Sequence, residues 1–367
     1  MNQAIKIVSL FDGISCGRVA LDRAGIAVSL YEAFEIDKYA KAISRYNYPG
    51  ILQHGDILEA DFTQFIDYDL VMGGSPCTFW SIAKANREVD KTGMGWKLFM
   101  GFVEAVQIIN PRFFLYENVA SMPASIKTYI SEELGVEPIL INSALLSAQS
   151  RKRLYWTNIK GITLPEDKGI LLKDILDSGL TCRDKSYCID ACYYKGGSHK
   201  RLDNQSGKRQ IVYEPVALAD KSQTILSTLH KENALSMLKR KKTGLFCAQE
   251  VGAIACSPVR VGSIGMGGQG NRIYSVQGKT IAIMANGGGR GGHAGLYKID
   301  LPDGDYIVRK LTPIEAERCQ TLSDNYTAFG VDVNGKTINI SNTQRYKCIG
   351  NGWTVDVITY ILKHLTL

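Results

Sequence analysis

The sequence predicts an α/β protein in which a doubly wound, mostly parallel sheet precedes a smaller, loop-rich β domain. Over about the first 160 residues, short apolar runs alternate with segments whose apolar residues have helical spacing. The apolar runs are continuous, as expected for parallel strands that are covered on both faces. Glycine and polar residues follow several of these runs, at the strand ends where ligands bind in such sheets.

The order of the elements supports this fold class. The first run leads into a glycine-containing turn, and the helical segment after it stops at Gly25. The expected strands are residues 5–10, 28–34, 69–72, 112–116, 139–141 and 154–157. The expected helices are residues 18–23, 37–46 and 96–110. Such a β-α-β-α order favours a parallel sheet with helices on both faces.

Changes in composition divide the chain into three sections. Helical periodicity is weak and glycine is dense from about residue 163 to residue 308. Helical spacing returns at Thr312-Pro313-Ile314-Glu315, which has the residues of a capping box with proline at the first helical position. A last apolar helix, at about residues 354–365, is expected to pack back on the first sheet. The predicted sections are residues 1–162, 163–334 and 335–367.

The bulk composition is that of an ordinary globular protein. The chain has 367 residues, a net charge of +7 and a hydrophobic fraction of 45%. A mildly basic balance permits nucleic-acid binding without establishing it. No apolar run reaches the roughly 18 residues of a membrane helix. Residues 1–6 lack the features of a signal peptide, so we expect a cytoplasmic protein that does not enter a membrane.

The nine cysteines are scattered and odd in number, which favours reduced thiols over a disulfide framework. Cys182, Cys188 and Cys192 together with His199 are candidate zinc ligands. Their spacing fits no common zinc module, so we expect no metal site.

Three groups at predicted strand ends suggest an adenosine-binding site. A glycine turn, residues 11–17, follows the first strand, Glu35 follows the second, and Asp56 lies farther along the chain. An acid after the second strand is suited to the hydroxyls of a ribose. A nicotinamide dinucleotide requires the GxGxxG pattern to hold its pyrophosphate, and that pattern is absent here. The turn therefore favours S-adenosylmethionine, which has no phosphate, although the turn alone is a weak signal.

A second set of polar side chains carries the chemistry. Cys77, in Gly73-Gly74-Ser75-Pro76-Cys77, comes just after a buried strand and begins a polar segment, residues 78–95, that we expect to be a long mobile loop. Glu117 follows a neighbouring strand, and Arg151 and Arg153 follow the next. A single cysteine is usually a core residue, but a thiol, a carboxylic acid and two guanidinium groups at successive strand ends predict a catalytic site.

At this point the chain resembles the cytosine-5 DNA methyltransferases. The matching stretches are FDGISCG at 11–17, FE at 34–35, GD at 55–56, GGSPC at 73–77, ENV at 117–119, QSRKR at 149–153, RKLTPIEAERCQ at 309–320 and GNGW at 350–353. GGSPC, ENV and QxRxR are highly specific in combination, although each is weak alone. The resemblance implies a Rossmann-like class I methyltransferase sheet in residues 1–162 and a target recognition domain in residues 163–334, with the C-terminal segment returning to the catalytic domain.

The chain departs from many bacterial members at two places. Those members have FAGxGG at the first motif and glutamine at the position of Thr78. Both features are closer to the animal de novo DNA methyltransferases, which carry a similar FDGI turn. Thr78 leaves the details of the catalytic loop open but does not change the expected chemistry.

The resemblance implies covalent catalysis on a cytosine that has been flipped out of the duplex. Cys77 would be the thiolate that adds to carbon 6, and Glu117 would hold ring nitrogen 3 and the exocyclic amine. Arg151 and Arg153 would lower the pKa of Cys77, contact the target nucleotide, or both. The loop that follows Cys77 would close over the base.

The resemblance also implies the partners and the binding residues. The cofactor is S-adenosylmethionine, and the macromolecular partner is double-stranded DNA. The expected cofactor residues are Phe11, Asp12, Gly13, Ile14, Cys16, Glu35, Ile36, Asp56, Ile57, Pro76, Leu98, Asn351 and Trp353. The expected DNA contacts are Ser81, Gln149, Arg151 and Arg153. A monomer of bacterial or phage origin is expected, either with or without a restriction partner.

Two other functions fit parts of the pattern. One branch of the same family methylates cytosine in tRNA, but the large glycine-rich middle section favours duplex DNA. A catalytically silent DNA-binding regulator is the other alternative. The presence of Cys77, Glu117 and Arg153 together argues against it, because a silent protein has no need of all three.

Overall fold

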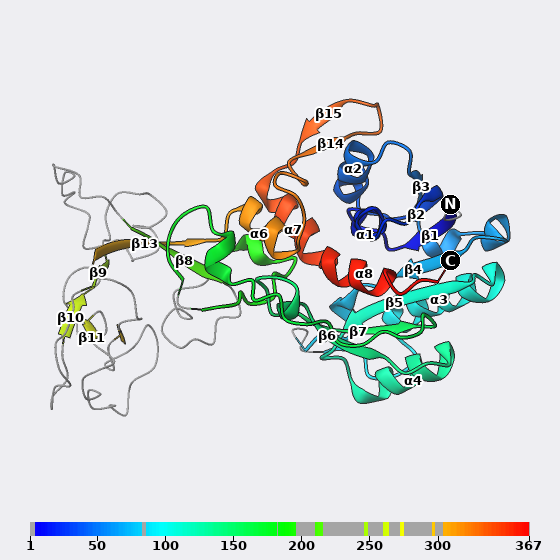
Figure 1. Cartoon of the computed structure of the whole chain (residues 1–367), viewed down its shortest axis with the longest axis horizontal. Coiled ribbons are helices and arrows are strands. Elements are labelled where there is room, and N and C mark those ends of the chain that lie inside the picture. Colours follow the sequence, from blue (N-terminus) through cyan, green and yellow to red (C-terminus); the bar gives the residue numbers. More distant parts are fainter. Residues whose placement is uncertain are drawn as a thin grey trace. The chain divides into compact units, whose positions relative to one another are not determined.

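The computed structural model describes residues 4–82, 86–181, 183–195, 210–215, 246–248, 260–263, 272–274, 296–297 and 304–366. The chain forms two compact units (Figure 1). The first unit comprises Met1–Leu171, Cys188–Tyr194 and Pro313–Leu367, and the second comprises Leu172–Tyr187 and Lys195–Thr312. No helix in the described part of the chain is both long and apolar enough to cross a membrane.

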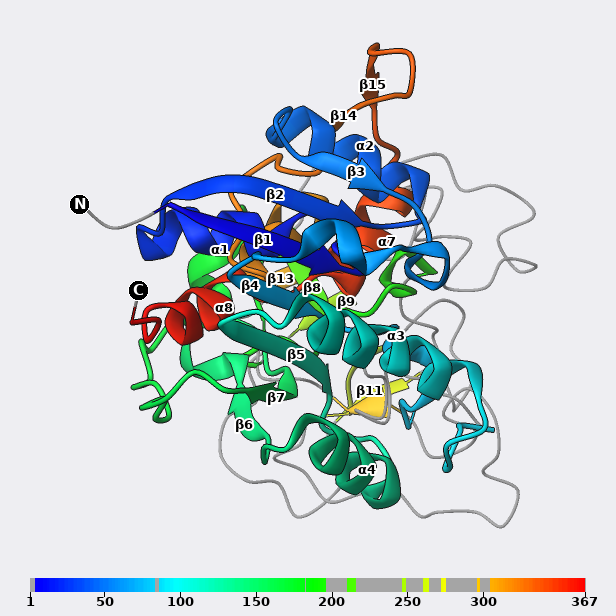
Figure 2. The same cartoon turned by 90° about the vertical axis from the view of Figure 1, so that its right-hand side faces the viewer.

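A seven-stranded sheet, in the order β3-β2-β1-β4-β5-β7-β6, is the centre of the first unit (Figure 2). Its strands are β1 (Ile5–Leu10), β2 (Val28–Phe34), β3 (Leu52–His54), β4 (Leu70–Gly73), β5 (Phe113–Val119), β6 (Ile139–Asn142) and β7 (Lys152–Thr157). The pairs among β1 to β5 are parallel, whereas β7 is antiparallel to both β5 and β6. The predicted doubly wound, mostly parallel class is confirmed.

Helices cover both faces of this sheet, which is why its strands read as continuous apolar runs. One core cluster includes side chains of α1 (Cys16–Ala24), α2 (Lys38–Asn47) and α8 (Val355–Leu362). A second cluster, on the opposite face of the sheet, includes side chains of α3 (Met94–Ile109) and α4 (Ala124–Leu134). The last helix therefore packs on the first domain, as the sequence predicts, and α1 and α8 lie against each other.

Local sequence explains where several helices begin and end. Asp37 caps α2, because its carboxylate accepts hydrogen bonds from the backbone amides of Tyr39 and Ala40. Gly25 ends α1 in the left-handed conformation, with φ of 74°. Pro313 is the first residue of α6 (Pro313–Cys319), as predicted.

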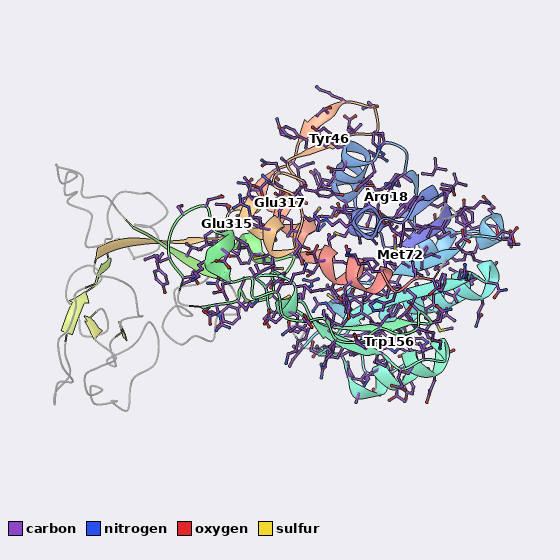
Figure 3. The ribbon with its side chains drawn as sticks, viewed as in Figure 1. Arg18, Tyr46, Met72, Trp156, Glu315 and Glu317 are labelled. Carbon is purple, nitrogen blue, oxygen red and sulfur yellow. The ribbon has the colours of Figure 1, made fainter. Side chains whose placement is uncertain are left out.

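A buried ion pair joins α6 to α7 (Asn342–Asn351), a helix that the sequence reading did not identify. Glu317, labelled in Figure 3, is fully buried and accepts a hydrogen bond of 2.8 Å from Nη2 of Arg345. Its second carboxylate oxygen accepts from the backbone amide of Asn325. A paired and fully hydrogen-bonded carboxylate is the form in which a charge is tolerated in a protein interior.

The unit boundaries differ from the predicted domain boundaries at 162 and 334. Residues 163–171 and 313–334 belong to the first unit. The physical reason is visible after α6, where the hydroxyl of Tyr326 donates to the carbonyl of Ile14 and β14 (Phe329–Val331) packs on α2. Tyr46, labelled in Figure 3, lies with its ring 5.6 Å from that of Phe329.

The described strands of the second unit form two small sheets. One has the order β8-β13-β9, and both of its pairs are antiparallel. The other has the order β10-β11-β12. The strands are β8 (Ile211–Pro215), β9 (Phe246–Ala248), β10 (Arg260–Ser263), β11 (Arg272–Tyr274), β12 (Leu296–Tyr297) and β13 (Gly304–Lys310). Most of the predicted glycine-rich section, including residues 287–292, lies outside the described residues.

Candidate active site

The sheet changes its direction of winding between β1 and β4, and the predicted catalytic loops start there. Leu10, at the end of β1, pairs with Gly73, at the end of β4. From β1 the chain passes to β2 on one side of this point, and from β4 it passes to β5 on the other side. Loops that leave adjacent strands in opposite directions open a crevice at their carboxyl ends, which is where ligands bind in doubly wound sheets.

Ser75 fixes the loop that carries Cys77. Its hydroxyl lies 2.6 Å from the hydroxyl of Tyr116, and its backbone carbonyl accepts a hydrogen bond from the amide of Asn118. All three residues are buried. The sequence reading missed this network, although Asn118 gave a signal, because a polar residue in an apolar strand usually has a buried partner.

Glu117 lies at the same edge and is held on both of its carboxylate oxygens. Its Oε1 is 2.8 Å from Nε of Arg153, and its Oε2 accepts a 3.0 Å hydrogen bond from the indole nitrogen of Trp353. Because β7 is antiparallel to β5, the start of β7 meets the end of β5, and Val119 pairs with Arg153. The structure thus brings Glu117 and Arg153, two predicted catalytic residues, together with Trp353, a predicted cofactor residue.

Arg151 and Arg153, which the resemblance placed together at Cys77 and the target nucleotide, differ in their main partners: Arg153 binds Glu117, whereas Arg151 binds backbone carbonyls. Its guanidinium donates to the backbone carbonyls of Ile189, Gly350 and Gly352, at 3.0 to 3.3 Å. The side chain is buried, with 6% of its surface exposed. Arg151 therefore joins three separate sections of the chain.

Gln149 is also placed differently from the predicted DNA contact. It is fully buried. Its amide nitrogen donates to the carbonyl of Cys319 and to the side chain of Gln320, and its amide oxygen accepts from the backbone of Ile189. These contacts leave Gln149 in the interior, where it supports the chain that leads into β7.

The electrostatic surroundings of Cys77 differ from the expectation in their net effect. Burial raises the pKa of its thiol, whereas Arg153 and Arg151 lower it and Glu117 raises it again. The net direction is upward. The two arginines do favour the thiolate, as predicted, but desolvation outweighs them in this state of the protein.

Gly74 can only be glycine in this arrangement, because a side chain there would meet the catalytic acid. A Cβ atom would lie 2.8 Å from Oε2 and 2.9 Å from the backbone oxygen of Glu117. We expect Gly74→Ala to displace the loop that carries Cys77 and to lower kcat by about a hundredfold or more. Gly50→Ala is the matched control, since a Cβ there meets nothing within 4 Å. Equal rates for both variants would contradict this geometry.

The first glycine turn is rigid and partly left-handed. Phe11, Gly13 and Ser15 have φ angles of 57°, 62° and 61°. The carboxyl of Asp12 accepts hydrogen bonds from the hydroxyls of Ser9, Ser15 and Tyr31, and burial raises its pKa in spite of these donors. The side chain of Asp12 thus supports the turn from within.

Glu35 lies against this turn in a way that bears on the cofactor class. Its Oε2 accepts a 2.8 Å hydrogen bond from the backbone amide of Gly13, and its Oε1 accepts from the amides of Ile36 and Asp37. Burial raises the pKa of Glu35, and these three amides oppose that effect. The carboxylate of Glu35 occupies the amide of Gly13 and repels a second anion from it. The turn therefore does not fit a pyrophosphate and does fit an adenosine cofactor that has no phosphate.

The other predicted cofactor residues lie on neighbouring elements. Ile36 has 74% of its surface exposed, directly after Glu35. Trp353 reaches the first turn, because its backbone amide hydrogen-bonds to Cys16, whose pKa burial raises to about 12. The remaining residues are buried (Ile14, Ile57), half-buried (Asp56, Leu98) or exposed (Pro76, Asn351).

The described part of the segment after residue 85 is anchored at several points, so it does not fit the mobile loop expected over residues 78–95. Arg87 donates to the carbonyl of Ser121. The ammonium group of Lys91 lies 4.9 Å from the ring centre of Trp96, 4.6 Å from that of Tyr129 and 3.2 Å from Glu133. Ser81, a predicted DNA contact, is half-buried and donates its backbone amide to the carbonyl of Cys77.

The candidate zinc ligands do not form a site in the described structure. Cys182 and His199 lie outside the described residues. Cys192 is exposed, whereas Cys188 contacts the guanidinium of Arg151. Among the described residues, no group of acidic, histidine and cysteine side chains is arranged to hold a metal.

Comparison with known proteins gives the family. The model of the C-5 cytosine-specific DNA methylase family matches residues 5–366. The chain belongs to this family. The match confirms the resemblance in the sequence and the prediction of a cytosine-5 DNA methyltransferase, and it makes the silent-regulator alternative unnecessary.

Individual relatives agree with this assignment. The orphan methyltransferase M.SPRI of Bacillus phage SPR is 26% identical, with 98% of this chain and 97% of that protein covered. The type II methyltransferase M.HhaI of Haemophilus parahaemolyticus is 27% identical, with 97% and 93% covered. The match to the orphan methyltransferase M.Rho11sI of Bacillus phage rho11s, at 25% identity, spans 81% of this chain and only 61% of that protein.

Solved structures share the fold of this methyltransferase. A DNMT2 mutant of Spodoptera frugiperda has a TM-score of 0.54 at 15% identity, with 98% of this chain and 99% of that chain covered. The EhMeth methyltransferase of Entamoeba histolytica also has a TM-score of 0.54, at 16% identity, with 99% and 98% covered.

Proposed function

We propose that this methyltransferase transfers a methyl group from S-adenosylmethionine to carbon 5 of a flipped-out cytosine in double-stranded DNA, through a covalent adduct with Cys77. The observation that carries the proposal is the convergence of Cys77, Glu117 and Arg153 at the winding switch of the sheet. The glycine turn and Glu35 lie at the same edge, so a methyl donor and a target base would meet there.

S-adenosylmethionine supplies an electrophilic methyl group on a positively charged sulfur. Carbon 5 of cytosine is a poor nucleophile until the thiolate of Cys77 adds to carbon 6, which places electron density on carbon 5. Carbon 5 then takes the methyl group. A base removes the proton of carbon 5, and the electron pair of that bond re-forms the double bond between carbons 5 and 6. The bond from carbon 6 to the Cys77 sulfur breaks, and the thiolate is restored.

Glu117 orients the base in this proposal. Its carboxylate faces the exocyclic amine and ring nitrogen 3 of the cytosine, where hydrogen bonding favours the electron shift that follows addition of the thiol. Arg153 and Trp353 fix the plane of the carboxylate before the base arrives. A group held in advance in this way loses little conformational freedom when the substrate binds.

The adenosine part of the cofactor would contact Phe11, Gly13, Glu35, Ile36, Asp56 and Ile57, and its methionine end would contact Asp12, Ile14 and Cys16. The pocket would be completed by Pro76, Leu98, Asn351 and Trp353. Support comes from the amide of Gly13, which is bonded to Glu35, and from the exposed Ile36, whose apolar surface is suited to the face of an adenine.

The second unit is proposed as the target recognition domain. Contacts of its basic residues with phosphates would make DNA binding weaken as salt increases.

Trapping on a substrate analogue tests this function directly. The wild-type protein is incubated with S-adenosylmethionine and duplex DNA that contains 5-fluorocytosine, which cannot lose its substituent at carbon 5. A covalent complex of protein and DNA that survives denaturation is expected. Because the target sequence is unknown, it is first located by bisulfite sequencing of DNA from cells that express the protein.

Substrate class is tested with labelled S-adenosylmethionine. Duplex DNA is expected to be labelled, whereas a tRNA pool and the same DNA as a single strand are expected to be poor substrates. Preferential labelling of tRNA would replace the proposal by the tRNA alternative.

A further inference from the structure

Cys188 lies beside the arginines of the active site, although the sequence gave no reason to place it there. It belongs to the short section Cys188–Tyr194, which is part of the first unit. Nη1 of Arg151 donates to its sulfur at 3.4 Å, and Nη2 of Arg153 lies 4.0 Å from the same atom. The thiol is half-buried.

Arg153 is therefore shared among several acidic groups. Its Nε lies 2.8 Å from Glu117, and its Nη2 faces Cys188. Burial lowers the pKa of Arg153, but the charges of Cys188, Glu117 and Cys77 raise it, and the net direction is upward. The charged groups that contribute to the pKa shifts of the two thiols are Glu117 on β5, Arg153 on β7, Arg151 just before β7 and, for Cys77, the other thiol.

The same arginines lower the pKa of both thiols, but the net shifts of the two thiols have opposite directions. Burial raises the pKa of Cys188, but Arg151 and Arg153 lower it by more, so the pKa of Cys188 falls below its usual value. The pKa of Cys77 rises above its usual value, and a negative charge on Cys188 is one of the causes. Cys188 is thus the first of the two to ionise as the pH increases.

We propose that Cys188 is a positioning residue of the methyl transfer. Its sulfur binds the guanidinium groups of Arg151 and Arg153, so that their positive charge stabilises the thiolate of the nucleophile Cys77 less strongly. This inference rests on the proposed role of Cys77. In the free enzyme, Cys188 holds the arginines, and Cys77 remains largely a thiol. A thiol is less reactive than a thiolate toward electrophiles and oxidants, so the nucleophile is protected before DNA binds.

A metal-binding role for Cys188 does not fit these contacts. Two guanidinium groups at the sulfur repel a cation from it. Simple packing does not require an ionisable group at this position, and serine would fill it with a similar shape while accepting the same hydrogen bonds. The proposal therefore concerns the charge of residue 188 and not its volume.

Alkylation measured across the pH range tests the order of ionisation in the wild-type protein. The full chain, without DNA, is treated with iodoacetamide, and mass spectrometry measures the rate at each cysteine. We expect the rate at Cys188 to rise at a lower pH than the rate at Cys77. The reverse order would overturn the proposal. This measurement needs no variant, so it is independent of any folding defect.

Two variants then separate charge from structure. Cys188→Ser removes the ionisable group, and we expect the alkylation profile of Cys77 to move to lower pH, with a severalfold faster reaction at pH 7. Cys188→Asp keeps a negative charge, and we expect the profile of Cys77 to return toward that of the wild type. Cys192→Ser is the control, because Cys192 is exposed and lies in the same short section. Identical Cys77 profiles in the Ser and Asp variants would rule out an effect of charge.

The same variants give a catalytic readout. In single-turnover methylation, the acidic limb of the pH–rate profile is expected to shift downward for Cys188→Ser and not for Cys188→Asp. A loss of structure would lower the rate at all pH values without this shift. If the wild-type protein forms no adduct with 5-fluorocytosine, the proposed function fails, whereas the order of ionisation of the two thiols is still decided by alkylation.

Discussion

Replacing Cys77 with serine is expected to abolish methyl transfer, with a fall in rate on the order of 10⁴-fold or more. A serine hydroxyl is far less acidic than a thiol, and the arginines that favour a thiolate cannot ionise it at neutral pH. The measurement is a single-turnover assay with labelled S-adenosylmethionine and duplex DNA. The trapping reaction with 5-fluorocytosine is expected to fail as well.

Cofactor binding provides the control for Cys77→Ser. The predicted cofactor residues lie mainly on the first turn and after β2, so the variant is expected to bind S-adenosylmethionine as the wild type does. Calorimetric titration measures this affinity. A variant that binds the cofactor and still methylates DNA at a wild-type rate would remove Cys77 from the mechanism.

Replacing Arg151 with methionine is expected to destabilise the first unit by about 3 kcal/mol or more, because buried carbonyls lose a charged donor. Three carbonyls, those of Ile189, Gly350 and Gly352, would be left without their bond to the guanidinium. Methionine fills much of the volume, so the loss reports on hydrogen bonding more than on packing. Urea denaturation, followed by the fluorescence of the tryptophans, measures the change in the free energy of unfolding.

Arg153→Met is the matched variant, two positions farther along the chain and within β7. Arg153 binds Glu117 and faces the thiols, and its guanidinium makes fewer bonds to the backbone. We expect this variant to lose most of its activity and to lose less stability than Arg151→Met, because Glu117 keeps its hydrogen bond from Trp353. Equal loss of stability in the two variants would contradict the division of roles between the arginines.

The sequence predicts the strands near the site well, because buried parallel strands have a simple signature. The runs that become β1, β2 and β5 are mostly apolar, and polar residues lie at or near their carboxyl ends, at Asp12, Glu35 and Glu117. The direction of β7 was harder to predict from hydrophobicity alone. Residues 143–151, which connect β6 to β7, are too few for a parallel crossover. The length of this connection therefore predicts that the two strands are antiparallel.

Placement of individual side chains is less accessible from sequence than the motifs that contain them. Gln149, Arg151 and Arg153 alternate along one motif, yet only Arg153 contacts Glu117. The partners of the other two lie at residues 189, 319, 320, 350 and 352, which become neighbours only after folding. The contact of Cys188 with the arginines was not predicted for the same reason, because no residue near it in the sequence indicates such a contact.

The contacts of Arg151 also bear on how such enzymes diverge. Both ends of the long section Lys195–Thr312 continue into the first unit, at Tyr194 and Pro313. With its ends fixed, a section that doubles in length adds only about 0.6 kcal/mol of closure entropy. Evolution can therefore lengthen, shorten or replace that section at little thermodynamic cost while the hydrogen bonds of Arg151 to the backbone are kept. On the proposal that this section belongs to the target recognition domain, new DNA specificities would arise by exchange of one segment, without any change to the chemistry.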